Sequence, residues 1–255
     1  EIGSGLVGSE MCIRDRTEAI ENILEACSYK QANPNLKVVV TGCLAERYRS
    51  QIEEEIPEVD AVVGCASNKA IDTIVARLFH GENHLESYGA KKDFPLGGKR
   101  VIGTPAHYAY LKIAEGCNNR CHYCAIPGIR GPLHSRDMAD CVAEARWLAG
   151  EGVKELIVVA QDPTAYGEDW GKPGSICELL DKLNKIPGLE WIRIMYAYPE
   201  RITDDFIAAM KRNEKVLPYL DLPIQHCNDT ILKNMNRRSC LLYTSPSPRD
   251  RSLSR

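Results

Sequence analysis

The amino-acid sequence predicts an α/β fold in two parts. Short apolar runs rich in valine and isoleucine alternate with segments whose apolar residues recur at helical spacing. Such alternation predicts parallel strands connected by helices that pack on their sheet. Glycines, charged residues and weak periodicity interrupt the pattern after residue 80, so we expect a linker over residues 81–104, with an interdomain hairpin as the alternative.

The first part, residues 17–80, is predicted to form an α/β layer. Its first helix is expected over Thr17–Gln31, with Thr17 as a cap, because Ile20, Ile23 and Leu24 lie on one helical face. The following elements alternate as strand Leu36–Val40, helix Ala45–Glu55, strand Val59–Gly64 and helix Asn68–Phe79.

The second part, residues 105–239, is predicted to contain four units of a strand followed by a helix. The strands are expected at Ala109–Ala114, Glu155–Ala160, Trp191–Tyr196 and Tyr219–Leu222. The helices are expected at Met138–Ala149, Ser175–Asn184, Asp204–Asn213 and Asp229–Met235. This order predicts a partial (β/α) barrel, whose reactive end lies at the carboxyl ends of the strands.

Composition places the chain among soluble globular proteins. Of its 255 residues 44% are hydrophobic and 26% are charged. No apolar run approaches the roughly 20 residues that span a bilayer, and the first residues lack the pattern of a signal peptide. We therefore expect a cytoplasmic protein without a membrane partner. The formal charge of −3 does not favour direct binding of nucleic acid.

Both ends of the chain resemble translated sequencing adapter. CIRDR, which ends the segment 1–16, is a translation of TGTATAAGAGACAG, and CLLYTS, which begins the segment 240–255, is a translation of TGTCTCTTATACACATCT. The two nucleotide sequences are opposite strands of one transposon end. We therefore leave residues 1–16 and 240–255 out of the fold prediction. Cys12 and Cys240 then drop out, and nine of the eleven cysteines remain.

The cysteines with the most informative spacing are Cys117, Cys121 and Cys124. They form a C-x3-C-x2-C pattern directly after the first predicted barrel strand. Three thiolates on one loop can hold three irons of a 4Fe–4S cluster and leave the fourth iron without a protein ligand. The alternative is a structural zinc site, which needs four ligands. No second cysteine pair lies nearby, and His122 is poorly placed to bind together with both of its neighbours.

The residues around this motif resemble the methylthiotransferase family of radical S-adenosylmethionine enzymes. LKIAEGCNNRCHYCAIPGIRGPLHSR (residues 111–136) and GVKELIVVAQDPTAYG (residues 152–167) carry the resemblance. YLDLPIQH (residues 219–226) is similar to the branch that modifies a ribosomal protein rather than transfer RNA. The resemblance implies a partial radical S-adenosylmethionine barrel, preceded by the C-terminal part of a flavodoxin-like domain. It also implies the cofactors, namely two 4Fe–4S clusters and S-adenosylmethionine.

The implied reaction converts the β-carbon C–H of an aspartate in small-subunit ribosomal protein twelve into C–SCH3. In the family, an electron from the open cluster cleaves S-adenosylmethionine and yields a 5′-deoxyadenosyl radical, so a low-potential electron donor is an implied partner. The family's carboxy-terminal substrate-binding module is not expected within this chain. The sister reaction, methylthiolation of an adenosine in transfer RNA, is the alternative. A non-catalytic metal-binding protein is a further one.

The resemblance also assigns a second cluster to the first part of the chain. VVVTGCLAERY (residues 38–48) is similar to the third cysteine motif of the family's amino-terminal domain and makes Cys43 an expected ligand. Its two partner cysteines are expected upstream, because Cys27 and Cys65 do not match them. We therefore expect the chain as written to leave this cluster incomplete and to be inactive. The alternative role of Cys43 is packing at a strand end.

Polar residues near the predicted reactive end are candidates for contacts with S-adenosylmethionine or with the substrate. Tyr123 lies between two of the cysteines. The others are expected at or near the ends of the barrel strands, at Gln161, Arg193, Tyr196 and Gln225. Each has the alternative role of a hydrogen bond or ion pair at the barrel rim. Arg130 and Arg136 are candidates for binding an acidic side chain, and their alternative role is a solvated surface.

Overall fold

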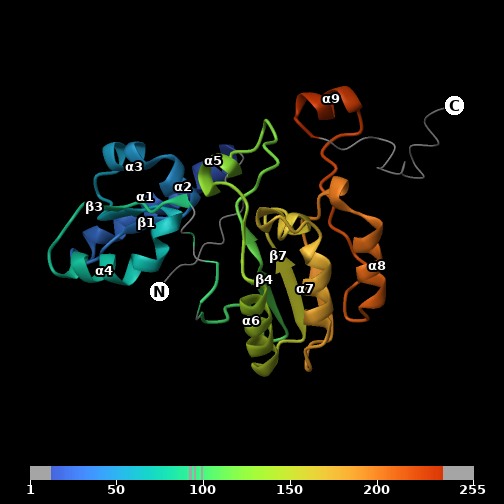
Figure 1. Ribbon diagram of the computed structural model, residues 1–255. Coiled ribbons are helices and arrows are strands. Elements are labelled where there is room, and N and C mark those ends of the chain that lie inside the picture. The colour runs from blue at the N-terminus through green and yellow to red at the C-terminus, as the bar shows by residue number, and fades with distance from the viewer. Residues whose placement is uncertain (1–12, 92–93, 95, 99, 238–255) are drawn as a thin grey trace. The chain divides into compact units, whose positions relative to one another are not determined.

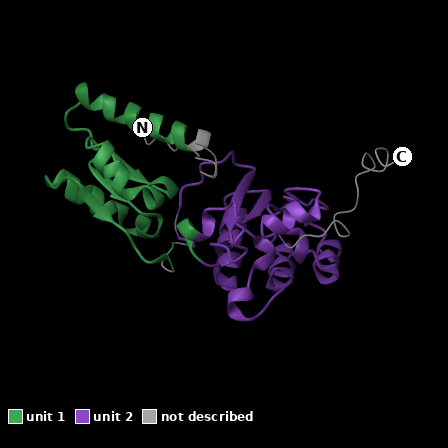
Figure 2. Ribbon diagram, turned by 90° about the horizontal axis from the view of Figure 1, so that it is seen from above, with its two compact units in different colours: residues 1–95, 128–131 green, residues 96–127, 132–255 purple. Residues whose placement is uncertain are grey.

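The computed structural model describes residues 13–91, 94, 96–98 and 100–237 and divides into two units (Figure 2). Unit 1 extends to residue 95 and includes residues 128–131, and unit 2 comprises residues 96–127 and those from 132 onward. Each unit has its own parallel sheet. The predicted α/β class is therefore confirmed.

The adapter-like segments lie almost wholly outside the described residues, which begin at 13 and end at 237. Helix α1 (Ile13–Ser28) starts before Thr17, so the prediction that Thr17 caps this helix is wrong. No glycine or proline lies between Ile13 and Thr17, and nothing in the local sequence stops the helix there.

The sheet of unit 1 consists of three short parallel strands in the order β1, β2, β3 (Figure 1). These are β1 (Val39–Thr41), β2 (Ala61–Val63) and β3 (Leu85–Ser87). The third strand lies inside the expected linker, so the linker prediction is wrong there. Leu85 pairs in register with Ala61 and is 9% exposed, but a three-residue strand is too short to show a sequence period.

Helices cover the strands of unit 1. They are α1, α2 (Cys43–Arg47), α3 (Arg49–Glu55) and α4 (Ile71–Phe79), with 3-10 turns at Tyr29–Gln31 and Cys65–Ala70. The single helix expected over Ala45–Glu55 is divided at Tyr48, whose backbone is not helical. Leu44 and Ile52, on either side of the break, are both buried in the core that includes Val38 and Val40. The break thus allows two short helices to bury their apolar faces on one strand.

The sheet of unit 2 also has three parallel strands, in the order β4, β7, β8. These are β4 (Tyr108–Lys112), β7 (Glu155–Val159) and β8 (Trp191–Ile194). Helices α6 (Met138–Gly150), α7 (Ser175–Asn184) and α8 (Asp204–Arg212) lie on one side of it (Figure 1). The expected order of strands and helices is confirmed for these three units, as befits part of a (β/α) barrel.

The fourth expected strand, Tyr219–Leu222, does not form. The chain runs beside β8, with Leu217 donating to Ile192 O at 2.9 Å and Ala197 to Asp221 O at 2.9 Å, but there is no continuous ladder. Prolines at 218 and 223 flank the segment and have no N–H to donate. Only an isolated bridge between Ile192 and Val216 is present here. The helix expected after it is confirmed as α9 (Asp229–Asn234).

Side-chain caps start three helices of unit 2 close to their predicted positions. Asp137 accepts from Ala139 N at 2.8 Å at the start of α6, and Thr203 accepts from Phe206 N at 3.2 Å at the start of α8. Asn228 caps α9 in the same way. The core beneath these helices includes fully buried leucines. Burial of each leucine side chain stabilises the fold by about 1.5–3 kcal/mol.

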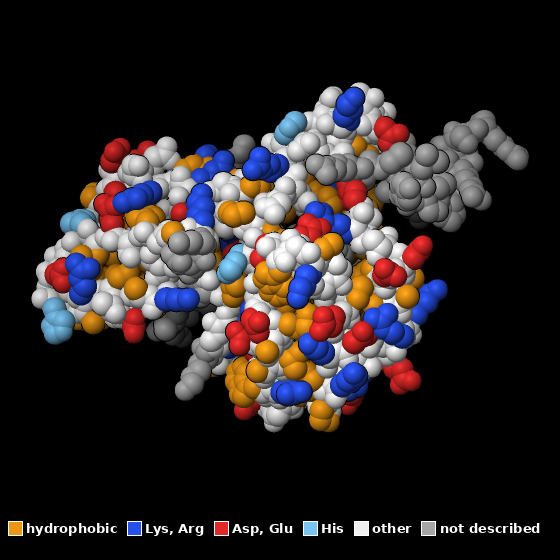
Figure 3. Space-filling model, in the orientation of Figure 1, with side chains coloured by type: hydrophobic (Ala, Val, Ile, Leu, Met, Phe, Trp, Pro, Cys, Tyr) orange, Lys and Arg blue, Asp and Glu red, His pale blue; other side chains and the backbone are white. Residues whose placement is uncertain are grey.

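The surface carries both signs of charge. On the face shown in Figure 3, acidic and basic side chains alternate with hydrophobic ones over both units. None of the helices in the described ranges is long and apolar enough to cross a membrane.

Candidate functional site

The three cysteines of the C-x3-C-x2-C pattern lie on one loop in unit 2. The loop begins at β5 (Ala114–Glu115), directly after β4, and leads into α5 (Ile126–Arg130). β5 pairs antiparallel with β6 (His134–Ser135), so the two ends of the segment are held together. The loop therefore lies beyond the carboxyl end of β4, where a (β/α) barrel carries its reactive groups.

Cys117, Cys121 and Cys124 are free thiols of intermediate exposure. Burial raises the pKa of the Cys117 thiol, and the charges of Asp162, Cys124 and Cys121 raise it further. Burial likewise raises the pKa of Cys124, with Cys121 contributing. The backbone N–H of Cys124 also donates to Cys121 O at 3.0 Å. The three sulfurs are thus electrostatic neighbours on one tight loop.

The chemistry of this donor set fits an iron–sulfur cluster. Cysteine thiolates are the usual ligands of 4Fe–4S clusters, and iron binding would displace the thiol protons. In the described part of the chain no three His, Cys, Asp or Glu side chains could together hold a metal ion as they stand. The fit therefore rests on the type and spacing of the donors.

His122 packs as a loop residue. Its Nδ1 lies 2.7 Å from Asn234 O, and its backbone N–H donates to Met235 O at 3.0 Å. Asn236 Nδ2 donates to Arg120 O at 2.8 Å on the same loop. The carboxyl end of α9 and the residues after it thus support the cysteine loop through two backbone carbonyls and the Asn236 side chain.

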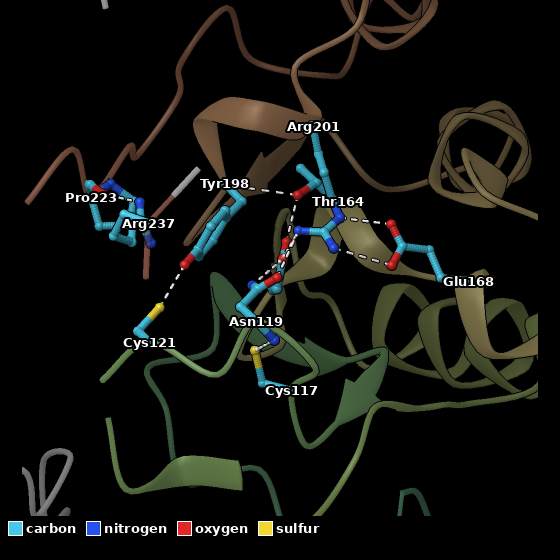
Figure 4. Close-up of polar contacts among 10 residues, drawn as sticks. Cys117, Asn119, Cys121, Thr164, Glu168, Tyr198, Arg201, Pro223 and Arg237 are labelled. Carbon is cyan, nitrogen blue, oxygen red and sulfur yellow. Dashed lines mark hydrogen bonds and ion pairs between the residues drawn. The ribbon is translucent and has the colours of Figure 1, made fainter. Parts of the chain in front are cut away.

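A polar network joins the cysteine loop to the segments after β7 and β8 (Figure 4). Asn119, between Cys117 and Cys121, donates its side-chain amide to Asp162 Oδ2 at 2.8 Å, and its backbone N–H lies 3.4 Å from Cys117 Sγ. Arg201 donates to Asp162 Oδ2 at 3.0 Å and to Asn119 Oδ1 at 2.9 Å. The same guanidinium forms a two-bonded pair with Glu168 at 2.6 and 3.1 Å. Three separate segments are thereby fixed around Cys117.

Cys121 contacts a different group. Its Sγ lies 2.8 Å from Tyr198 Oη, and the Arg237 guanidinium lies 3.8 Å from the centroid of the Tyr198 ring (Figure 4). Burial raises the pKa of the Tyr198 hydroxyl above its ordinary value, and the hydrogen bond with Cys121 raises it further. Arg237 also donates to Pro223 O at 2.7 Å.

Two of the expected cofactor contacts lie beside the cysteine loop. Gln161, just after β7, donates Nε2 to Glu115 Oε1 at 2.8 Å, and its Oε1 is buried without a partner among the described residues. Glu115 is 1% exposed and also pairs with Lys112. Tyr123 is 40% exposed, and burial, with the neighbouring Cys121, raises its pKa to about 12. Both residues stay predicted contacts of the cofactor.

The other expected contacts are not brought to the cysteines by any interaction in the described residues. Arg193 pairs with Glu155 Oε1 at 2.5 Å and lies over the Tyr219 ring. Glu155 begins β7, so this charge is directed toward the amino ends of the strands. Tyr196 is 51% exposed and Gln225 is exposed, and both have left-handed backbone.

Cys43 opens α2 in unit 1, at the carboxyl end of β1, after Gly42 with φ of 101°. Its Sγ accepts from Arg130 Nη2 at 3.2 Å. The thiol of Cys65 hydrogen-bonds with Cys43, which together with burial raises the pKa of Cys65. Cys43 therefore has a thiol neighbour that was not expected from the sequence. The described residues of unit 1 do not complete a three-cysteine site.

Arg136 is not on a solvated surface. It is 6% exposed, pairs with Glu144 and donates to Asp140 O at 3.3 Å. Tyr166 Oη donates to its carbonyl at 2.7 Å. The alternative of a solvated arginine is therefore wrong for Arg136. Its guanidinium binds two residues of α6, Asp140 and Glu144.

Sequence reasoning missed the residues that surround the cysteines from other segments, namely Asn119, Asp162, Tyr198, Arg201 and Arg237. One signal was present for two of them, since Asp162 follows Gln161 and Tyr198 follows the β8 strand at the predicted reactive end. The others depend on packing between distant segments, which a single sequence does not show.

Two families match the chain. Residues 111–241 match the Radical SAM superfamily, and residues 12–80 match a family described as uncharacterized protein family UPF0004. The first match contains all three cysteines of the loop, and the second contains Cys43.

Curated relatives cover both parts of the chain. A ribosomal protein uS12 methylthiotransferase RimO of Acetivibrio thermocellus is 47% identical over 231 residues, which are 88% of this chain and 51% of the relative. Enzymes of the same name from Caldicellulosiruptor saccharolyticus and Thermoanaerobacter are 44% and 43% identical, again over 88% of this chain and 51% of theirs. The chain thus spans about half the length of these relatives.

A solved structure shares the fold. The radical S-adenosylmethionine methyltransferase TsrM from Kitasatospora setae superposes with a TM-score of 0.62 at 12% identity, over 89% of this chain and 49% of that one. At this identity the likeness shows the arrangement of strands and helices alone.

Proposed function

Because this chain belongs to the Radical SAM superfamily, we propose that it is part of a methylthiotransferase acting on small-subunit ribosomal protein uS12. The observation that carries the proposal is the loop of Cys117, Cys121 and Cys124 beyond the carboxyl end of β4. Identities of 43–47% to uS12 methylthiotransferases over 88% of the chain support the substrate. The product would carry C–SCH3 in place of C–H at the β-carbon of an aspartate.

The residues that would hold the first 4Fe–4S cluster are Cys117, Cys121 and Cys124. The bound cluster together with S-adenosylmethionine supplies a carbon radical that can remove hydrogen from an unactivated C–H bond. The chain itself positions the ligands: Asn119, Asp162 and Arg201 fix the loop on one side, and Tyr198 contacts Cys121. Gln161, Tyr123, Arg193 and Gln225 are proposed contacts of S-adenosylmethionine or the substrate.

Cys43 is the proposed ligand of the second cluster of the family. Cys43 lies at the start of α2 and is partly exposed, and the Arg130 guanidinium supplies a positive charge beside its thiol. We propose that the remaining ligands of that cluster lie outside the described residues, because Cys27 and Cys65 do not match the family's motif. A low-potential electron donor is the proposed reducing partner, and the cytoplasm, where ribosomes assemble, is the proposed compartment.

The cluster assignment is tested by anaerobic reconstitution with iron and sulfide. We expect the chain to bind a 4Fe–4S cluster seen by electron paramagnetic resonance after reduction, and to cleave S-adenosylmethionine to 5′-deoxyadenosine. Alanine at Cys117, Cys121 or Cys124 should abolish both signals. Cys177→Ala, on α7, is the matched control and should leave both intact. Tight zinc binding without sulfide uptake, or an intact cluster in the loop variants, would contradict the assignment.

The substrate is tested separately on the whole protein, supplied with uS12 or with transfer RNA. We expect uS12 to gain one CH2S unit at an aspartate, read by peptide mass spectrometry. Gain of the same unit on adenosine, with uS12 unchanged, would replace the proposal with the transfer-RNA reaction.

A further inference from the structure

Cys121 is contacted by a side chain from a distant part of unit 2. Tyr198 Oη lies 2.8 Å from Cys121 Sγ, across 77 positions of sequence (Figure 4). The ring is 9% exposed, and its backbone N–H is 3.3 Å from Thr164 Oγ1. The hydroxyl is therefore held at the sulfur by a buried and fixed side chain. By contrast, Cys117 receives a backbone N–H, from Asn119 at 3.4 Å.

Arg237 lies over the ring of Tyr198. Its guanidinium carbon lies 3.8 Å from the Tyr198 centroid, close enough for a strong cation–π interaction. The residue is 5% exposed, donates to Pro223 O, and its Nε has no hydrogen-bond partner among the described residues. A buried cation on the ring withdraws electron density from the phenol oxygen, which makes the O–H a stronger donor.

The direction of the hydrogen bond follows from metal binding. Once Cys121 is an iron ligand it is a thiolate without a hydrogen, so in the pair with Tyr198 the hydroxyl is the donor. Hydrogen bonds to the sulfurs are among the factors that set the reduction potential of a cluster. Reduction adds negative charge to the cluster and its sulfurs, so a donor stabilises the reduced state more than the oxidised one.

We propose that Tyr198, with Arg237 stacked on it, raises the reduction potential of the cluster held by Cys117, Cys121 and Cys124. The inference rests on the proposed function, because it concerns the cluster that this function requires. Tyr198 acts through Cys121 and is therefore a positioning residue, which makes the cluster easier to reduce by the electron donor.

The test is a potentiometric titration of the reconstituted chain, followed by the electron paramagnetic resonance of the reduced cluster. Tyr198→Phe removes the donor and should shift the midpoint to a more negative potential while the iron content stays unchanged. At a fixed potential, the ratio of reduced to oxidised cluster should fall on the order of fivefold, the effect of losing one net hydrogen bond. Tyr29→Phe, the same change in unit 1, is the control and should shift nothing.

A double-mutant cycle tests the role of Arg237. Arg237→Met should also lower the midpoint, by less than Tyr198→Phe does. In the Tyr198→Phe background the part of its effect that acts through the hydroxyl should be lost, and the part that remains measures the direct interaction of Arg237 with Cys121. If Tyr198→Phe does not assemble a cluster, the midpoint potential of Arg237→Met tests the inference in its place.

An unchanged midpoint in a fully loaded Tyr198→Phe or Arg237→Met variant overturns the inference and leaves the proposed function standing. Failure of the unaltered chain to form a 4Fe–4S cluster overturns the proposed function instead, so the two failures are distinguishable.

Discussion

Asn119 and Asp162 join the cysteine loop to the end of β7 through a hydrogen bond of 2.8 Å. Asp162 is 1% exposed, and the same oxygen accepts from Arg201 at 3.0 Å. Its other oxygen accepts from Thr164 Oγ1 at 2.5 Å. One buried carboxylate therefore fixes Asn119, which lies between two of the proposed iron ligands.

Removing this carboxylate should weaken both the fold of unit 2 and the loop. Asp162→Ala leaves the Asn119 amide without its acceptor and removes one partner of Arg201, which keeps Glu168, so the expected cost is about 1–3 kcal/mol for the unsatisfied buried group. We expect that fall in the free energy of unfolding by urea titration, together with lower iron content after reconstitution. Glu178→Ala removes the exposed pair with Lys182 and should cost less than about 1 kcal/mol. Equal effects of the two substitutions would contradict the anchoring role.

The buried carboxylate of unit 1, Asp60, predicts a dependence of stability on pH. It accepts from Val38 N at 2.7 Å and pairs with Lys30 at 2.5 Å and Lys37 at 3.2 Å. Burial acts to raise the pKa of Asp60, but the bonds from Lys30, Val38 and Lys37 outweigh it and hold the pKa below its ordinary value of 3.8. A lowered folded-state pKa stabilises the fold above the unfolded value, and this stability is lost as the pH falls through the folded value.

Asp60→Asn should therefore lower the Tm of unit 1 at pH 7, by an amount corresponding to roughly 1–3 kcal/mol for the weakened bonds. The difference in Tm from the unaltered chain should shrink as the pH falls below 4, because the carboxylate of the unaltered chain is then protonated. Thermal denaturation at several pH values measures this. A difference that stays constant down to the acid limit would show that the charge of Asp60 is not responsible.

Local patterns in the sequence predicted the elements that are long and periodic. Helices α6 and α7 begin at the predicted residues because Asp137 caps the first and Gly174 precedes the second. The cysteine loop was also predictable, because its spacing is local. The contact between Cys121 and Tyr198 was not, since it spans 77 residues and depends on how the segment after β8 returns over the loop. The wrong prediction of a strand at Tyr219–Leu222 has a local cause. The prediction gave more weight to the apolar residues of the segment than to the two prolines that flank it.

The turn before Cys43 depends on a glycine. Gly42 has φ of 101° and ψ of −163°, a conformation that only glycine adopts readily, and a Cβ there would meet nothing within 4 Å. Gly42→Ala should therefore destabilise unit 1 by about 1–3 kcal/mol through backbone strain alone. Gly103→Ala is the control, since its site is equally open and its φ is not positive. Urea titration compares the two, and a Gly42→Ala variant as stable as the control would exclude the strain.

Arg136 and Glu144 form a buried pair, with exposed side-chain fractions of 7% and 9%. Arg136→Ala removes the buried partner of Glu144 and leaves this carboxylate with Arg100, at 2.9 Å, whose side chain is 38% exposed. We expect a loss of about 3 kcal/mol in the free energy of unfolding, the lower end for breaking a buried pair.

The double variant separates pairing from substrate binding. If Arg136 serves the fold, Arg136→Ala combined with Glu144→Ala should be more stable than Arg136→Ala alone, because the buried carboxylate that lost its buried partner is gone. The KM for the substrate should then be unchanged in every variant that remains folded. If Arg136→Ala raises KM while the free energy of unfolding stays the same, the arginine serves an acidic substrate side chain, as one of the two roles considered from the sequence requires.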